Sequence, residues 1–181
     1  MAQSDLTKRA LAESMKQLMR ENTVEKITVE EILADAKVSR RSFYRYFNDK
    51  FELLEWIYDQ DFCQWVMVRP EKSLWDYYPE ICEYLYRDRH FFAHAFSYRG
   101  QNSFRAFCFE KLFPLIMNDF GAVFSDQAIA RFAVRRYVYA GFDGFVWWLS
   151  QEPCMPWQDY VKLSMDVIRT TADGIVRSFQ K

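Results

Sequence analysis

Glycine and proline are scarce in this chain of 181 residues. Each occurs five times, the first proline is Pro70, and the first glycine is Gly100. Short strands joined by tight turns depend on these two residues, so their absence from the N-terminal part argues against a β-sheet there. The same stretch is rich in Leu, Ala, Met, Glu, Lys and Arg, which favour helices. We therefore expect an all-α protein.

Features of secreted and membrane proteins are also missing. No apolar run approaches the roughly 18 residues of a membrane span, and the N-terminus lacks the basic and apolar regions of a signal peptide. The four cysteines are widely spaced and form no C-x-x-C pair, which is typical of free thiols in a reducing compartment. These absences predict a cytoplasmic protein with no membrane partner.

Signatures of catalysis and of metal binding are equally lacking. The two histidines, His90 and His94, have the i, i+4 spacing that suits two metal ligands, but no nearby cysteine or carboxylate completes a set. The chain has no Gly-rich phosphate loop and no G-x-S-x-G motif. We expect no enzyme, no cofactor and no metal site.

A basic segment lies within a chain whose formal net charge is only −1. Residues 37–50 contain five Lys or Arg and a single Asp, a local charge of +4. An arbitrary basic stretch is usually a solvated face, so the element that carries this charge decides its meaning.

Capping signals divide the first fifty residues into three helices. Thr28 and Glu31 have the spacing of a capping box, and Ser39 repeats the N-cap signal after a turn of about four residues. Two short helices joined by a tight turn, behind a longer first helix, predict a helix-turn-helix within a three-helix unit. The expected helices cover residues 5–22, 29–36 and 39–47.

The rest of the chain is predicted to be helical as well. Asp49 can cap a fourth helix, and Pro114 should kink or split the helix that contains it. We place a DNA-binding domain at residues 1–49 and a regulatory and dimerisation domain at residues 50–181. The remaining helices are expected at residues 50–67, 74–87, 89–98, 103–118, 126–150 and 156–179.

The short helix after Ser39 has a surface suited to DNA. Phe43 and Phe47 lie four residues apart and point inward, whereas Arg41 and Arg45 project from other faces. Guanidiniums bind guanine edges or phosphates, and a helix of this size fits the major groove. The alternative, a merely solvated basic face, is less favoured on the second helix of a helix-turn-helix.

Residues 27–54, ITVEEILADAKVSRRSFYRYFNDKFELL, resemble the DNA-binding region of the tetracycline-repressor (TetR) family of bacterial transcription factors. The resemblance implies a homodimer that places one recognition helix in each of two successive major grooves of double-stranded DNA. It further implies phosphate contacts from Thr28, Ser39, Tyr44 and Lys50, and base contacts from Arg40, Arg41, Ser42 and Arg45.

Two positions depart from the pattern of that family. Lys37 stands where the turn usually has glycine, so we expect a non-glycine residue in a left-handed conformation. Tyr46 replaces the common histidine, and we keep it among the DNA-contacting candidates.

Thirty of the 34 aromatic residues follow residue 50, and three uses for them stay open: an ordinary core, a ligand cavity and a dimer interface. The polar segment after residue 97 can present side chains to a small effector, or it can be a helix connection capped by Asn102 or Ser103. The candidate effector-pocket residues are His94, Tyr98, Arg99, Gln101, Asn102 and Trp147.

The last two expected helices carry apolar stripes that can pair with a second copy in a four-helix bundle, or pack inside one chain. Gly141 and Gly144 would permit close approach of the backbones. The candidate interface residues are Phe132, Arg136, Tyr137, Gly141, Gly144, Trp148, Val167, Ile168, Thr171 and Ile175.

Repression by occupancy of a pseudo-palindromic operator is the expected mode of action. The run GQNSF, with Trp56-Ile57 and Trp75, also resembles a subgroup related to the activator of dihydroxyacetone-kinase operons. That resemblance implies an alternative, an activator or adaptor whose C-terminal domain binds a partner protein instead of a small ligand.

Overall fold

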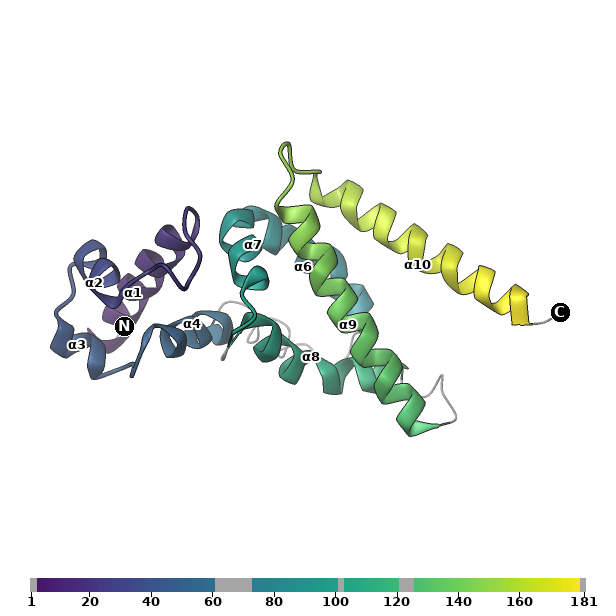
Figure 1. The fold of residues 1–181 in the computed structure, drawn as a ribbon, viewed down its shortest axis with the longest axis horizontal. Coiled ribbons are helices and arrows are strands. Elements are labelled where there is room, and N and C mark those ends of the chain that lie inside the picture. The colour runs from purple at the N-terminus through teal and green to yellow at the C-terminus, as the bar shows by residue number, and fades with distance from the viewer. Residues whose placement is uncertain (1–2, 61–72, 101–102, 121–125, 180–181) are drawn as a thin grey trace.

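The computed structural model describes residues 3–60, 73–100, 103–120 and 126–179, and every regular element within these ranges is a helix (Figure 1). The expected all-α fold is therefore confirmed. The described helices are α1 (Gln3–Met19), α2 (Val29–Ala36), α3 (Arg40–Tyr44), α4 (Lys50–Tyr58), α6 (Leu74–Arg87), α7 (Arg89–Ser97), α8 (Phe104–Phe120), α9 (Gln127–Leu149) and α10 (Trp157–Phe179).

Helices α1, α2 and α3 form a small unit at one end of the molecule (Figure 1). Thr28 caps α2 as predicted, because its hydroxyl accepts from the Glu31 N–H while its own N–H donates to the Glu31 carboxylate. Lys37 ends α2 in the predicted left-handed conformation, with φ 54°. The turn after it leads directly into Ser39 and α3.

Contacts at the ends of α1 and α4 join this unit to the remaining helices. His94 on α7 donates through Nδ1 to the Met19 carbonyl at 2.5 Å, and Arg20 forms an ion pair with Asp88 at 3.0 Å. Phe51 on α4 stacks on the ring of Tyr98, with 5.6 Å between the ring centroids. The joint between this unit and the remaining helices is thus formed by contacts of α1 and α4 with α7, in addition to the chain connection through α4.

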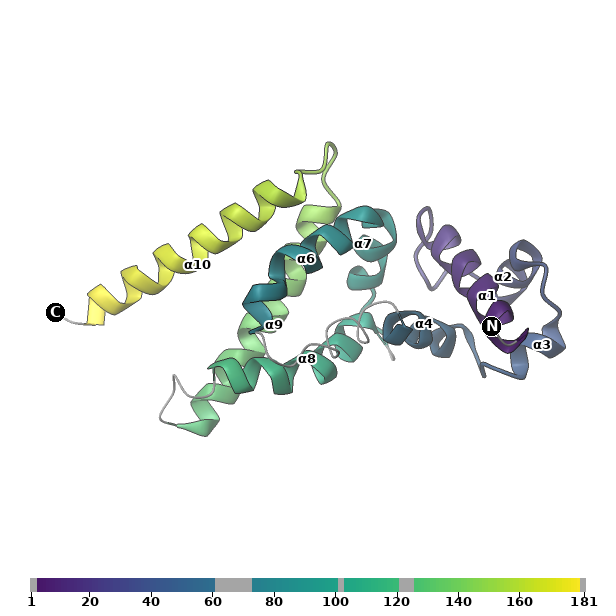
Figure 2. The same cartoon turned by 180° about the vertical axis from the view of Figure 1, so that it is seen from behind.

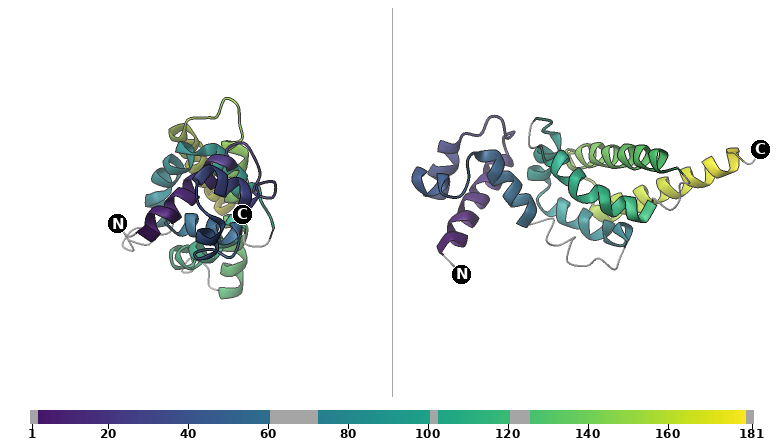
Figure 3. Two further views of the ribbon diagram at one scale, coloured as in Figure 1. Left: turned by 90° about the vertical axis from the view of Figure 1, so that its left-hand side faces the viewer. Right: turned by 90° about the horizontal axis from the view of Figure 1, so that it is seen from below.

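Helices α7, α8 and α9 pack together in the larger part of the molecule, and α6 packs against α10. The first turns of α10 rest on α9, where Tyr160 stacks on Trp148 with 4.0 Å between ring centroids. Beyond this contact α10 extends away from the other helices, as the reverse view and the view from below both show (Figures 2 and 3).

The buried side chains form one cluster that extends from α1 to the start of α10. It includes Leu11 and Phe43 of the small unit, Tyr58 of α4, and Phe96 and Trp148 of the larger part. Within the part of the chain that the structure describes, no helix is both long and apolar enough to cross a bilayer.

The observed helix bounds agree closely with those expected, with four differences. Helix α1 ends at Met19 rather than near residue 22. Helix α3 ends at Tyr44 rather than near residue 47, because a turn follows it. Helix α8 passes through Pro114 as one element, so of the two expected effects of this proline, a kink or a split, the split does not occur. The later part of the expected helix 50–67 lies outside the described residues.

Candidate nucleic-acid interface

The short helix α3 is held in place by one cap and two buried rings. The Ser39 hydroxyl accepts from the Ser42 N–H at 3.1 Å, which confirms the predicted N-cap. Phe43 and Phe47 are both buried, as their spacing predicts, and their rings pack against each other. The polar residues of α3 consequently face away from the core.

Three arginines, Arg40, Arg41 and Arg45, lie in this short helix or directly after it, and their environments differ. Arg41 and Arg45 are exposed, and within the described structure neither has a hydrogen-bond or ion-pair partner for its side chain. Arg40 instead forms an ion pair with Glu30 of α2 at 2.6 Å and lies over the exposed ring of Tyr44. Two guanidiniums are therefore free to bind an external anion or base edge.

Several predicted phosphate contacts already have partners inside the chain. The Thr28 hydroxyl is bonded to Glu31, and the Ser39 hydroxyl lies 2.9 Å from that of Ser42. Lys50 donates to the Ile27 carbonyl at 2.5 Å and to the Glu25 carbonyl at 3.1 Å. We read Lys50 as a support of the segment before α2, which differs from the phosphate contact that we expected.

Tyr46 faces a different environment from that expected of a DNA-contacting residue. Its ring is half-buried against the core, and the Lys8 ammonium lies 5.6 Å from the ring centroid. The same ammonium lies 5.8 Å from the Trp56 ring and 6.0 Å from the Phe47 ring. The aromatic side chain at position 46 thus packs α1 against the end of the helix-turn-helix, and its contact with DNA stays a prediction.

Sequence reasoning missed Glu30 and Lys8. Glu30 has no distinguishing signal in the sequence beyond its place in the first turn of α2, yet it is the partner of Arg40. Their separation of ten residues gives no local signal, because the contact exists only once the turn has brought α2 and α3 together. Lys8 is equally remote in sequence from the rings that surround it.

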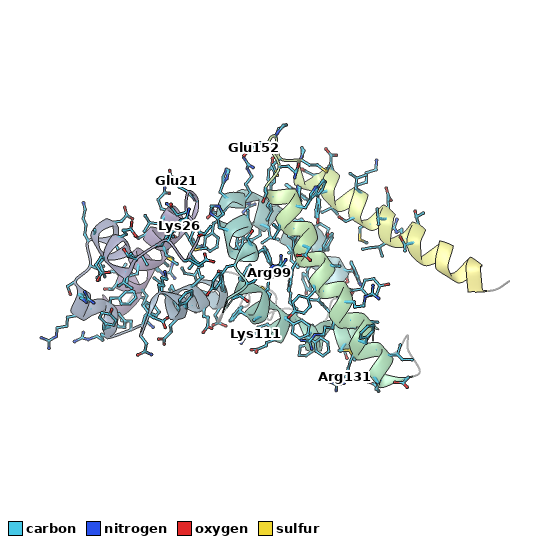
Figure 4. The ribbon with its side chains drawn as sticks, in the orientation of Figure 1. Glu21, Lys26, Arg99, Lys111, Arg131 and Glu152 are labelled. Atoms are coloured by element: carbon cyan, nitrogen blue, oxygen red, sulfur yellow. The ribbon has the colours of Figure 1, made fainter. Side chains whose placement is uncertain are left out.

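The predicted effector-pocket residues are not brought together. His94 bonds to α1, Tyr98 stacks on Phe51, and Arg99 extends toward α9, where it pairs with Asp143 at 3.0 Å (Figure 4). Trp147 is 57% exposed on α9. Gln101 and Asn102 lie outside the described residues, so the four described members of the expected pocket face four different surroundings.

A cleft of about 480 Å³ lies elsewhere, between α1 and α4, and none of the predicted pocket residues lines it. The region around Arg99 is organised by charge instead. Arg105 is 4% exposed, and its guanidinium binds the Phe96 carbonyl and lies 2.7 Å from the Asp143 carboxylate. Arg105 and Arg99 together lower the pKa of the Asp143 carboxyl.

The structure corrects one residue of the predicted dimer stripe on α9. Trp148 is fully buried against Tyr160 and donates to the Met155 carbonyl at 2.8 Å, so it is a core residue and not an interface residue. Its neighbour in sequence, Trp147, is exposed instead. Two exposed residues of the stripe, Phe132 at 65% and Tyr137 at 66%, lie on the surface as expected.

The two glycines of this stripe also differ. A Cβ added at Gly141 would meet nothing within 4 Å, so the surface there is open. At Gly144 an added Cβ would lie 3.1 Å from the Tyr160 hydroxyl, so this glycine makes room for α10 of the same chain. Val167 and Ile168 of α10 are exposed, Thr171 likewise, and the side chain of Ile175 lies outside the described residues.

Comparison with known families and proteins agrees with this arrangement. Residues 8–57 match the family described as bacterial regulatory proteins, tetR family, and residues 73–170 match a transcriptional regulator C-terminal region. The chain belongs to the TetR family of bacterial transcriptional regulators. Proteins of this family are transcriptional regulators with a helix-turn-helix, not enzymes, as the sequence predicts.

One curated relative of this TetR-family regulator is the HTH-type dhaKLM operon transcriptional activator DhaS of Lactococcus lactis subsp. lactis (strain IL1403). The two are 39% identical over 64 residues, which is 35% of this chain and 34% of DhaS. The match therefore spans about a third of the curated relative.

Two solved structures share the fold over nearly the whole chain. The dihydroxyacetone kinase operon activator DhaS superposes with a TM-score of 0.60 and 20% identity, covering 91% of this chain and 95% of DhaS. A TetR transcriptional regulator from Streptococcus agalactiae 2603V gives a TM-score of 0.64 and 20% identity, covering 92% and 95%. At this identity the likeness establishes the fold.

Proposed function

We propose that this TetR-family regulator binds a specific pseudo-palindromic DNA site as a homodimer and controls transcription from it in the cytoplasm. The observation that carries the proposal is the pair of guanidiniums of Arg41 and Arg45, which have no partner among the residues that the structure describes and lie beside the buried rings that fix α3. A rigid helix with free Arg side chains can read guanine edges and grip phosphates. Symmetry of the dimer would match the symmetry of the site.

Exposed apolar side chains support the homodimer. Phe132, Tyr137 and Trp147 of α9 and Val167 of α10 are each more than half exposed. Large apolar side chains exposed on the surface of a protein are typical of an interface. A second copy that contributes the same two helices would cover all of them in a four-helix bundle.

Footprinting of the DNA upstream of the chain's own gene tests the DNA-binding proposal. The double variant Arg41→Ala/Arg45→Ala should lose a protected site that the wild type covers, because it removes both free guanidiniums of this surface. The matched control is Arg87→Ala, which removes an exposed guanidinium from α6 and should leave the footprint intact. An unchanged footprint in the double variant would contradict the assignment of this surface.

The dimer has a separate test by light scattering. Phe132→Glu and Val167→Glu should each convert a dimer at micromolar concentration into a monomer, since each would bury an unpaired charge in the interface. Leu6→Glu changes an apolar residue of α1 that is 50% exposed and should leave the dimer unchanged. A monomeric wild type would end this part of the proposal.

Repression by operator occupancy is the primary mode that we propose, and regulation would reach α3 through the joint between α1, α4 and α7. Activation through a partner protein is the second candidate, favoured by the likeness to DhaS, which is named an activator of an operon. Transcription in vitro with the purified chain separates the two modes. Reduced transcription with the chain alone supports repression, whereas increased transcription that requires cell extract supports the partner-dependent activator.

A further inference from the structure

Glu30 is an acid beside the basic recognition helix, and the proposed function does not explain it. It lies in the first turn of α2, and its Oε1 is 2.6 Å from Nη1 of Arg40. The two side chains remain 62% and 65% exposed. Such exposed ion pairs contribute little to folding stability, so stability alone is a weak reason for an acid at this position.

The guanidinium of Arg40 is restrained from two sides. The Glu30 carboxylate holds Nη1, and the guanidinium carbon lies 5.6 Å from the centroid of the Tyr44 ring. Only Nη1 is used by the ion pair, so Nε and Nη2 keep donors for another acceptor. Arg41 and Arg45, by contrast, have no acid against them in the described structure.

DNA affinity has two components, attraction to phosphates and contacts to base edges, and the contacts of Arg40 act differently on each. Attraction to phosphates is independent of sequence and grows with unpaired positive charge, whereas contacts to base edges depend on a fixed orientation of the donors. An acid that neutralises and orients Arg40 weakens the first component and preserves the second.

We propose that Glu30 is a specificity-determining residue, which positions Arg40 and keeps its charge from adding to sequence-independent DNA affinity. The inference rests on the proposed function, because it requires that α3 binds DNA. Glu30 acts here through Arg40 and needs no contact of its own with a base.

The test is a double-mutant cycle on random-sequence duplex DNA, measured over a range of salt concentrations. Glu30→Gln keeps the shape of the side chain and should tighten binding at low salt, with a slope of log K against log salt steeper by about 0.9. The same change in the Arg40→Ala background should leave the slope unaltered. Asp35→Asn is the matched control, because it removes an exposed acid from α2 that has no described side-chain partner; it should not change the slope.

Selection of preferred sites from randomised duplexes supplies the second measurement. Glu30→Gln should lower discrimination by about tenfold at the base pair whose preference is lost in Arg40→Ala. An equal slope change in Asp35→Asn would reduce the effect to net charge and overturn the inference. A Glu30→Gln variant that behaves as the wild type would also overturn the inference, provided that the wild type binds DNA. Absence of salt-dependent binding by the wild type would overturn this inference and the proposed function together.

Discussion

Lys50 offers a test of whether a predicted phosphate contact is instead a support of the helix-turn-helix. Its ammonium donates to the carbonyls of Ile27 and Glu25, in the segment that leads into α2, and burial lowers its pKa. A hydrogen bond to a charged group contributes about 1.5–3 kcal/mol, and the desolvation that lowers the pKa of the ammonium offsets part of this, leaving about 1 kcal/mol for each bond. Replacing Lys50 with Met should therefore lower the free energy of unfolding by about 1–2 kcal/mol.

Thermal unfolding and DNA binding together form the assay. For a chain of this length the loss corresponds to a Tm lower by about 2–8 °C. The control is Lys26→Met, which removes the same charge from an exposed residue of the same segment and should not change Tm (Figure 4). An unchanged Tm for Lys50→Met, with a salt slope shallower by about 0.9, would refute the supporting role and restore the phosphate contact.

Three further changes test other parts of the structure. Lys37→Gly should raise the free energy of unfolding by about 1 kcal/mol in urea titrations, because glycine adopts φ 54° without strain, and an unchanged midpoint would contradict this. Asp143→Asn should lower it by about 1–2 kcal/mol, since buried Arg105 loses its counter-charge while Asp143 itself is more than half exposed. Arg105 lowers the pKa of Asp143, so the wild type keeps this stability above about pH 4 and loses it as the pH falls further, and acid titration of the variant should show a weaker dependence. Tyr58→Phe should raise Tm slightly, by the equivalent of up to about 1 kcal/mol, because the fully buried hydroxyl has no hydrogen-bond partner among the described residues, and a lower Tm would show that it has one.

Local signals explain why the helix-turn-helix was predictable. A cap depends on residues two or three positions apart, so Thr28, Ser39 and Asp49 could be assigned from spacing alone, and each accepts backbone N–H bonds in the structure. The left-handed Lys37 was expected from the resemblance to the TetR family, in which this turn position usually has glycine, and the structure confirms it.

Tertiary contacts explain what the sequence could not supply. Trp147 and Trp148 are neighbours in an apolar stretch, and about 100° of helix rotation separates their side chains. Which of them is buried depends on where α6 and α10 pack against α9. Without that information the sequence placed Trp148 in the dimer stripe and Trp147 in the effector pocket, whereas Trp148 is buried and Trp147 is exposed. The partners of Arg40 and Lys50 were missed for the same reason, because they come from segments that are distant in sequence.

The single cluster of buried side chains has a consequence for how the molecule unfolds. Because the cluster runs from α1 to α10 without a polar gap between the two parts, heating should give one cooperative transition rather than a separate melt of the N-terminal helices. A fragment ending near residue 58 would expose the buried ring of Tyr58, which packs against Phe91, Phe104 and Phe107 of the larger part. Any event that loosens the larger part then also loosens the recognition helix, so the occupancy of DNA becomes a readout of the folding equilibrium of the whole chain.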